Sequence, residues 1–264
     1  MKKRYIFGLG ISIGTFDNIQ SEIITLAKNN KSASVFLSNV HMLIEAKLDP
    51  DFEKIFNAAD IVTSDGMPIC FALRMLQGIK QERVAGMDLF PSLIAKAEEE
   101  GLSVFFLGST DDVIAKIVSL CAVRHPTLNI SGFYSPPFRE LTKREHSALI
   151  DGINNSDTQI LFVALGCPKQ ENFIWSLKDK VSSVMLGVGG AFPVLAGTVT
   201  RAPMWAQRSG LEWLYRFSKE PRRLFKRYFF TNTIFVFLLF GSYFKKKVTD
   251  IIGRKNQKRT TLPS

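Results

Sequence analysis

The sequence predicts an α/β protein, with a largely parallel, Rossmann-like sheet wrapped by helices and a helical, membrane-associating appendage at the C-terminus. Three observations support this prediction. Short β-branched and aromatic runs alternate with longer amphipathic segments over residues 1–200, and such alternation gives parallel strands. A chain of 264 residues accommodates one large α/β domain and an appendage. Residues 201–264 hold 15 Lys and Arg against 3 Asp and Glu, whereas residues 1–200 hold 19 against 21.

Six strands and six helices are predicted in alternation. The strands are short apolar runs rich in β-branched and aromatic residues, at 34–38, 59–63, 103–107, 128–133, 159–165 and 182–188. The helices have apolar residues at intervals of three and four, at 19–28, 67–76, 89–100, 112–124, 143–153 and 169–177. Ligands of such sheets bind outside the carboxyl ends of the strands. We therefore expect the functional residues in the turns that follow the strands.

The N-terminus has two features of a signal peptide, because Lys2, Lys3 and Arg4 precede an apolar run at residues 5–13. No small-residue cleavage site follows the run, and glycines at positions 8, 10 and 14 interrupt it. We therefore expect a first β-strand here.

The appendage, residues 201–264, contains the most apolar stretch of the chain, residues 228–244, with basic residues on both sides. Seventeen residues are few for a bilayer span, and basic flanks on both sides disfavour moving either one across the membrane. We expect an interfacial or re-entrant helix on an anionic membrane surface, to which the basic residues 254–259 are also attracted. Burial of the tail at a homo-oligomer interface is the alternative.

Cysteine and histidine spacing indicates neither a disulfide framework nor a metal site. Three cysteines without paired spacing fit a reducing compartment, and the three histidines lie far apart. The sequence Asp49-Pro50-Asp51 imitates a metal-binding D-x-D motif, but its proline and the apolar residues after it are typical of a helix start. We expect no required metal or cofactor.

Asp65 follows the second predicted strand in the sequence Ser64-Asp65-Gly66-Met67-Pro68, where Gly66 relaxes the backbone and Pro68 suits the first turn of a helix. Asp65 has two interpretations here. It can cap that helix, or it can be a general base at the end of a strand.

Three further turns carry polar groups. Gly108-Ser109 can bind a phosphate at a helix N-terminus, or simply begin the helix. Gln170 offers both a donor and an acceptor to a base or a sugar. Gly189 and Gly190 follow the last strand without dinucleotide-site spacing, so they indicate either close approach to a ligand or a tight turn.

Taken together, these segments resemble the WecG/TagA/CpsF family of bacterial glycosyltransferases. The resemblance extends over residues 4–230 in the family's order. It is carried by Asn39 and by the segments 58–60 (Ala-Ala-Asp), 64–66 (Ser-Asp-Gly), 83–89 (Arg-Val-Ala-Gly-Met-Asp-Leu), 106–108 (Phe-Leu-Gly), 166–171 (Gly-Cys-Pro-Lys-Gln-Glu), 187–192 (Gly-Val-Gly-Gly-Ala-Phe), 196–197 (Ala-Gly), 201–203 (Arg-Ala-Pro), 210–216 (Gly-Leu-Glu-Trp-Leu-Tyr-Arg) and 220–224 (Glu-Pro-Arg-Arg-Leu).

The resemblance implies an inverting transfer of a sugar, N-acetylmannosamine or a related hexose or uronic acid, from a UDP-sugar donor. The acceptor it implies is a sugar on a membrane polyprenyl diphosphate, in the synthesis of a surface polysaccharide or teichoic acid. In a single displacement one base deprotonates the acceptor hydroxyl, so one essential carboxylate is expected, and the resemblance favours Asp65. The implied location is the cytoplasmic face of the cell membrane, with peripheral or monotopic attachment.

The leaving diphosphate gathers negative charge that something must stabilise. Part of this task falls to the helix N-terminus at Gly108-Ser109, and we expect the rest from arginines, whose guanidinium groups match phosphate oxygens. The candidates in the family-like part of the tail are Arg201, Arg216, Arg222 and Arg223. Asn39 and Gln170 then hold sugar or base, while Arg83 and Asp88 either line the pocket or form a structural ion pair. The appendage thus divides near residue 227, with active-site completion before that point and membrane docking beyond it.

Two positions depart from the family pattern. Pro193 stands where many relatives carry Asp, and Leu37-Ser38-Asn39 replaces a triplet such as Thr-Pro-Asn. Because proline provides no side-chain hydrogen bond, we expect donor recognition to differ here.

Two other classes of function are alternatives to an enzyme. Nucleic-acid binding is disfavoured because the basic residues are interleaved with a Phe/Leu run and no binding motif occurs. A non-catalytic membrane scaffold of glycan assembly is the second alternative. It would have the same tail and would differ from an enzyme only in the residues of the turns after the strands.

Overall fold

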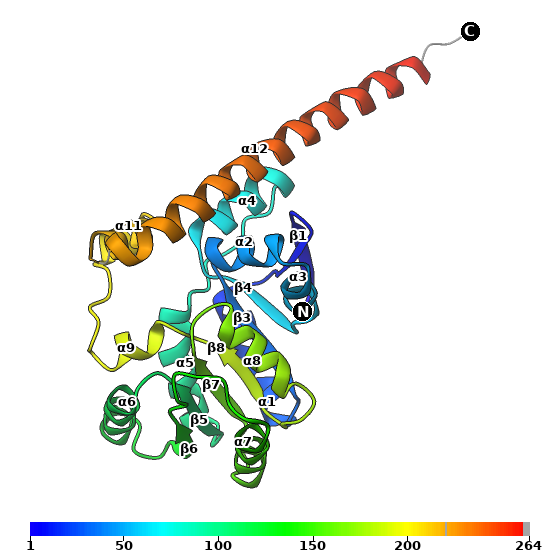
Figure 1. Cartoon of the computed structure of the whole chain (residues 1–264). Coiled ribbons are helices and arrows are strands. Elements are labelled where there is room, and N and C mark those ends of the chain that lie inside the picture. The colour runs from blue at the N-terminus through cyan, green and yellow to red at the C-terminus, as the bar shows by residue number, and fades with distance from the viewer. Residues whose placement is uncertain (220, 261–264) are drawn as a thin grey trace.

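The computed structural model describes residues 1–219 and 221–260, without the side chains at positions 208, 216, 223, 226, 227 and 249–260. Helices cover both faces of a six-stranded sheet, and a long C-terminal helix crosses one side of this body (Figure 1). The predicted fold class is confirmed.

All six strands of the main sheet are parallel, and they lie side by side in the order β4-β3-β8-β7-β5-β6. Their bounds agree with the predicted runs to within two residues: β3 (Ala33–Ser38), β4 (Ile61–Ser64), β5 (Ser103–Gly108), β6 (Asn129–Tyr134), β7 (Ile160–Ala164) and β8 (Val184–Gly187). The four inner strands are buried throughout, which explains why they are nearly continuous apolar runs without alternation.

The expected first strand is a hairpin outside this sheet. β1 (Lys3–Ile6) and β2 (Leu9–Ser12) pair antiparallel, and the turn between them gives Phe7 and Gly8 positive φ angles of 56° and 89°. Gly8 adopts this conformation without strain, so the chain reverses direction here. The sequence predicted a single strand in this run.

The helices of the body form two layers. α1 (Phe16–Lys28), α5 (Gly86–Glu99), α6 (Asp111–Arg124) and α9 (Ala191–Leu195) pack on one face of the sheet. On the other face lie α2 (Val40–Leu48), α3 (Pro50–Ala58), α4 (Met67–Gln77), α7 (Lys143–Asn155) and α8 (Lys169–Leu177). α3 begins after Asp49, whose side chain accepts hydrogen bonds from the first turn, so the helix-start interpretation of Asp49-Pro50-Asp51 is confirmed.

The first layer is held by a cluster of four fully buried phenylalanines. Phe90 of α5 lies 4.7 Å from Phe162 of β7 and 5.1 Å from Phe192 of α9, measured between ring centroids. Phe106 of β5 completes the cluster at 6.2 Å from Phe90. Aromatic pairs at these distances stabilise the core beyond their area burial. The cluster therefore fixes the strand ends from which the glycine-rich turns emerge.

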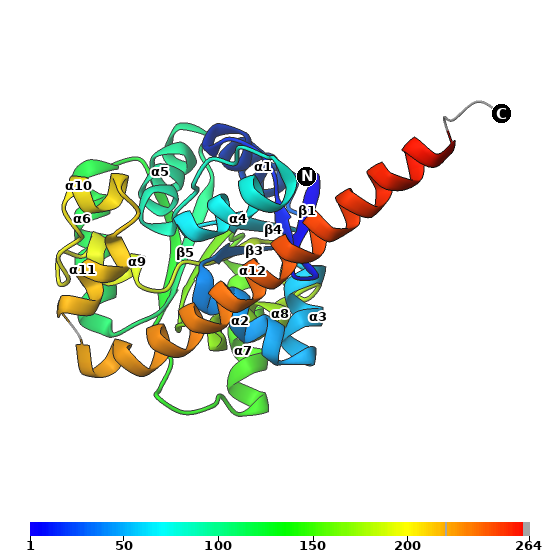
Figure 2. The ribbon, with the colours of Figure 1, turned by 90° about the horizontal axis from the view of Figure 1, so that it is seen from above.

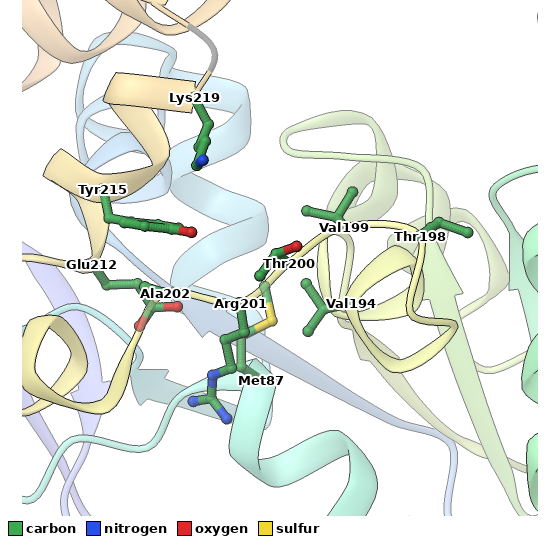
Figure 3. A pocket seen from close by; sticks show the side chains of 10 residues that line it. All are labelled: Met87, Val194, Thr198, Val199, Thr200, Arg201, Ala202, Glu212, Tyr215 and Lys219. Atoms are coloured by element: carbon green, nitrogen blue, oxygen red, sulfur yellow. The ribbon is translucent and has the colours of Figure 1, made fainter.

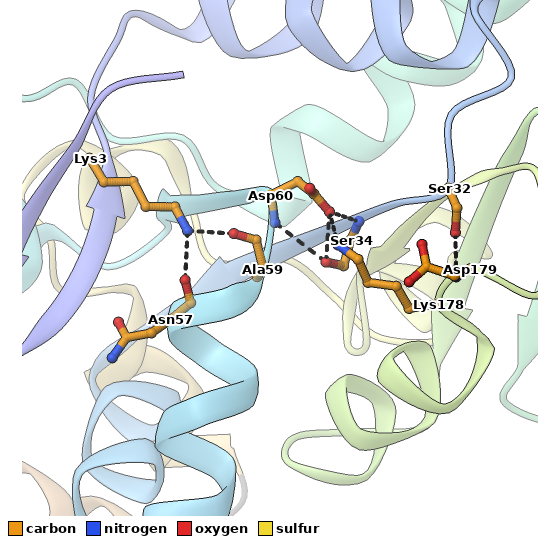
Figure 4. A network of polar contacts seen from close by, with 8 residues as sticks. All are labelled: Lys3, Ser32, Ser34, Asn57, Ala59, Asp60, Lys178 and Asp179. Carbon is orange, nitrogen blue, oxygen red and sulfur yellow. Dashed lines mark hydrogen bonds and ion pairs between the residues drawn. The ribbon is translucent and has the colours of Figure 1, made fainter.

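The amino-terminal edge of the sheet is closed by polar contacts (Figure 4). Asp60 accepts hydrogen bonds from the Ser34 backbone and hydroxyl at 2.8 and 3.1 Å and from the Lys178 ammonium group. Burial raises the pKa of Asp60, but the hydrogen bonds from Lys178 and Ser34 outweigh it, and the net effect is a lowered pKa. Asp60 belongs to a family-like segment, and its role here is to join β3 to the end of α8.

The appendage is helical, with α10 (Met204–Arg208), α11 (Glu212–Lys219) and α12 (Pro221–Thr260). α12 contacts α2 and α4 and then extends beyond the body (Figure 2). Its contact face consists of Leu224, Thr231, Phe235 and Leu239, all buried and spaced by seven or four residues, as one face of a helix requires. The apolar stretch 228–244 is thus the middle of a longer continuous helix. Within the described part of the chain, none of the helices combines the length and the apolarity needed to cross a membrane.

Candidate active site

The carboxyl ends of β3 and β4 bring Asn39 and Asp65 together. The Asp65 backbone N–H donates to the Ser38 carbonyl at 2.9 Å, which joins the two strand ends. A Cβ added to Gly66 would lie 3.6 Å from the Asn39 Cα, so the two turns are in contact. Because the strands are adjacent and parallel, residues far apart in sequence meet at this edge.

Asp65 is not the cap of the helix that follows it. Gly66 is the N-cap residue of α4 and makes no side-chain capping bond. Asn39 caps a different helix, α2: its Oδ1 accepts a hydrogen bond from the Met42 N–H at 3.2 Å. Asn39 therefore uses its side-chain oxygen within the fold.

Arg83 lies beside Asp65 and connects it to the appendage. Its Nε donates to the Asp65 backbone carbonyl at 2.7 Å, and its Nη2 lies 3.9 Å from Asp65 Oδ1. The same Nη2 donates to Glu212 Oε2 of α11 at 2.7 Å. The side chains of Asp65, Arg83 and Glu212 are between 14% and 24% exposed, so these charges interact with little solvent between them.

A second ion pair joins the appendage to the body. Arg201 Nη2 lies 2.7 Å from Asp88 Oδ1, at the start of α5. The sequence left two alternatives for Arg83 and Asp88, which were to line the pocket or to form a structural ion pair. The structure pairs each of them with a residue of the appendage. Both appendage partners lie more than 110 residues further along the chain, a distance over which sequence spacing carries no pairing information.

Gly108 and Ser109 lie where β5 passes close to β7. Gly108 has a φ of 107°, and a Cβ there would be 2.4 Å from the Ala164 carbonyl oxygen. The Ser109 N–H donates to the same carbonyl at 2.9 Å. The backbone N–H of Ser109 is therefore used within the fold, and α6 begins two residues later, at Asp111.

Gln170 holds the two glycine-rich turns together. It is 4% exposed, its Oε1 accepts from the Gly166 N–H at 3.1 Å, and its Nε2 donates to Glu171 Oε1 at 2.8 Å. A Cβ on Gly187 or Gly189 would come within 2.9 to 3.1 Å of the Gln170 amide. Gly190, by contrast, is the N-cap of α9. Gly187 and Gly189 thus leave the space that the Gln170 side chain occupies.

Glu171 is fully buried beside Gln170, and its Oε2 has no hydrogen-bond partner in the described part of the chain. Burial raises its pKa to about 7, against weaker opposing hydrogen bonds from Gln170 and Cys167. Burial therefore favours the protonated, neutral form of this carboxyl group.

A cavity of about 260 Å³ lies between the α9 region and the appendage (Figure 3). Tyr215 and Lys219 of α11 extend over it from one side, and Met87 closes it near Arg201. The full lining is Met87, Val194, Thr198, Val199, Thr200, Arg201, Ala202, Glu212, Tyr215 and Lys219. Asp65 does not line the cavity, but Glu212 does, and Glu212 is the ion-pair partner of Arg83, which contacts Asp65.

The structure brings Asn39, Asp65, Arg83, Asp88 and Arg201 to one region, and Gln170 with Gly189 to the neighbouring turns. Of the remaining arginines, Arg222 is exposed on α12, while the side chains of Arg216 and Arg223 lie outside the described residues. Among the residues that the structure describes, no three His, Cys, Asp or Glu side chains gather to hold a metal ion.

The sequence prediction missed Glu212, Tyr215 and Lys219. The first two belong to the family-like segment 210–216, which singled them out without indicating a role. Glu171 likewise belongs to the family-like segment 166–171, but the sequence does not indicate that its side chain is buried.

A parallel α/β sheet with an acid, an arginine and glycine-rich turns at its carboxyl edge, beside a ligand-sized cavity, has the architecture of an α/β enzyme. Residues 4–249 match the model of the glycosyl transferase WecG/TagA/CpsF family. The chain belongs to this family of glycosyltransferases.

Two relatives bear the same name, N-acetylglucosaminyldiphosphoundecaprenol N-acetyl-beta-D-mannosaminyltransferase. The chain is 32% identical to that of Bacillus spizizenii over 220 residues, which cover 80% of this chain and 84% of the relative. It is 31% identical to that of Bacillus subtilis over 186 residues, or 70% and 71% of the two chains.

Proposed function

We propose that this protein is an inverting glycosyltransferase that moves a sugar from a UDP-sugar to a sugar carried on a polyprenyl diphosphate. The names of the two relatives support the lipid-linked acceptor and favour N-acetylmannosamine as the transferred sugar. The observation that carries the proposal is Asp65, an acid at the carboxyl edge of the sheet that does not cap its helix and lies beside Arg83.

Asp65 is the general base of the reaction. Its carboxylate accepts the proton of the acceptor hydroxyl as that oxygen bonds to the anomeric carbon of the donor sugar. The bond from this carbon to the UDP oxygen breaks, and the electron pair leaves with UDP. Attack and departure on opposite faces invert the anomeric centre, so one carboxylate suffices.

Cations of the appendage stabilise the leaving diphosphate in this mechanism, which requires no metal. Arg201 lies at the cavity and Lys219 extends over it, so both add positive charge where the phosphate charge develops. Arg216, Arg222 and Arg223 remain candidates for the same role. The domain division is part of the proposal: residues 1–200 carry the base, and residues 201–264 complete the site and dock the enzyme.

α12 docks the enzyme on the cytoplasmic face of the membrane, as a peripheral or monotopic protein. Opposite its contact face, Phe229, Phe237 and Phe244 are 62 to 74% exposed and are spaced by eight and seven residues, which places them on one face. Lys245, Lys246 and Lys247 follow this aromatic face and complement anionic lipid. The enzyme thereby meets its lipid-linked acceptor at the surface where that acceptor lies.

Turnover by the Asp65→Asn variant tests the proposal. Full-length protein is incubated with vesicles that carry an N-acetylglucosaminyl-diphosphate polyprenol and with a panel of UDP-sugars, and glycosylated lipid is measured. We expect D65N to lose about 10²- to 10⁴-fold in rate, whereas D151N, at an exposed aspartate of α7, keeps the wild-type rate. Full activity of D65N would refute Asp65 as the base, and absence of turnover by the wild-type protein would favour the non-catalytic scaffold. Loss of wild-type activity with a chelator would refute the metal-free mechanism.

A further inference from the structure

One contact of the appendage reaches the proposed base through a single side chain. The Arg83 guanidinium group lies between two carboxylates, 3.9 Å from Asp65 Oδ1 and 2.7 Å from Glu212 Oε2, measured from the same Nη2 atom. Glu212 is therefore the nearer partner and makes the hydrogen bond. Arg83 Nε donates separately to the Asp65 backbone carbonyl, so a second hydrogen bond holds the guanidinium group next to Asp65.

The position of this cation matters to a base. An arginine in a close, paired contact with a carboxylate covers its oxygens and stabilises the ionised form, so the carboxylate becomes a weaker proton acceptor. An arginine held slightly away still attracts an anionic substrate but leaves the carboxylate oxygens accessible. The distance between Arg83 and Asp65 therefore controls how well Asp65 can accept a proton.

Glu212 is well placed to hold that distance. It is the first residue of α11, where a negative charge is favoured by the helix dipole, and its side chain is only 14% exposed. The first turn of α11 is anchored by hydrogen bonds from the Leu214 and Tyr215 N–H groups to the Leu211 carbonyl. The carboxylate therefore extends toward Arg83 from the first turn of a regular helix.

We infer that Glu212 is a positioning residue for catalysis, which holds the Arg83 guanidinium group beside Asp65 but off its carboxylate. This inference rests on the proposed role of Asp65 as the base. It assigns the appendage a task beyond supplying cations and docking: α11 sets the distance between Arg83 and the base, so the site is complete only when the appendage is in place.

Among the side chains that the structure describes, the Cys70 thiol of α4 also lies near Asp65; burial is the main influence on its pKa, and the charges of Arg83 and Asp65 have smaller effects. Burial raises the pKa of Cys70, so the thiol stays neutral through the working range of pH and does not itself alter the charge at the site. Of the two carboxylates that share Arg83, only Glu212 can be neutralised by mutation without removing the base.

Replacement of Glu212 tests the inference in the full-length enzyme, with the vesicle assay above run from pH 4.5 to 9. We expect E212Q to lower kcat about tenfold or more, because Arg83 moves onto Asp65. The same move shifts the acidic limb of the kcat profile down by about one pH unit, since a carboxylate paired with arginine stays ionised to lower pH. The KM for the UDP-sugar stays within about twofold if substrate contacts are unaltered.

Two variants serve as controls. E212D keeps the charge and should restore the position of the acidic limb and most of kcat. E99Q removes an exposed carboxylate from α5, which follows Arg83, and should behave as the wild type. Far-UV circular dichroism establishes that each variant is folded at the assay temperature, and E212N, which also removes the charge, replaces E212Q if the latter does not fold.

The outcomes separate this inference from the proposed function. An inactive D65N together with an unshifted acidic limb in E212Q would refute the positioning role and leave the base in place. An active D65N would refute the base itself, whatever E212Q does. A shifted limb that E212D restores supports the inference, because a purely structural loss lowers the rate at all pH values without moving the limb.

Discussion

Replacing Gly108 by alanine tests whether the close approach of β5 and β7 fixes the catalytic edge of the sheet. The added Cβ would lie 2.4 Å from the Ala164 carbonyl oxygen, 2.6 Å from its carbon and 2.9 Å from its nitrogen. These are backbone atoms of a central strand, which cannot rotate away as a side chain could. The residue would also retain a φ of 107°, which side chains rarely adopt.

Both effects destabilise the fold. A residue in such a conformation costs roughly 1–3 kcal/mol, and overpacking costs about as much again. We therefore expect G108A to lower the free energy of unfolding by about 2–5 kcal/mol. At about 2–4 °C per kcal/mol for a chain of this size, the unfolding midpoint should fall by roughly 10 °C.

Urea unfolding and thermal melts measure this change, and Gly152 supplies the control. Gly152 lies within α7, and a Cβ there meets nothing within 4 Å, so G152A should raise the free energy of unfolding by about 0.5–1 kcal/mol. A G108A protein as stable as the wild type would show that the strands separate at little cost and would refute the reasoning. Equal destabilisation by both substitutions would do the same.

Two further predictions concern Glu171 and the aromatic face of α12. Because burial raises the pKa of Glu171 from 4.5 to about 7, the folded state keeps a proton that the unfolded state releases between these values. Stability should thus fall by up to about 3 kcal/mol as the pH rises from 4.5 to 7. E171Q should remove this slope, and a slope that persists in urea titrations would contradict the assignment. The double variant F237E/F244E should reduce co-sedimentation with anionic vesicles at least about tenfold, since each Phe side chain that becomes buried in the membrane contributes roughly 1.5–3 kcal/mol to binding. F138E, at a 99% exposed side chain of the body, should have no effect, and equal binding by all three proteins would exclude α12 as the docking element.

The order of strands and helices was predictable because each element depends on residues close together in the sequence. The buried strands are apolar runs, and the helices repeat their apolar residues every three or four positions, so neither signal needs the tertiary structure. The hairpin at the N-terminus was missed because its turn depends on the backbone conformation at Phe7 and Gly8, which the apolar run conceals.

The candidate site was predictable only in part. The turns after the strands indicated Asn39, Asp65 and Gln170, since parallel strands place their carboxyl ends at one edge. What these residues do was not predictable: Asn39 caps a helix, Asp65 does not, and Gln170 is 4% exposed between two turns. Such roles depend on neighbours that the sequence does not identify.

The sequence by itself determined that this chain forms a parallel α/β body with a basic, apolar appendage, because composition and periodicity are local properties. Only the tertiary structure decided that Arg83 lies between Asp65 and Glu212 and that Arg201 meets Asp88. The physical reason is that an ion pair depends on distances of a few ångströms in space. Those distances are set when α11 folds back onto the strand ends, across more than 120 residues of chain between Arg83 and Glu212.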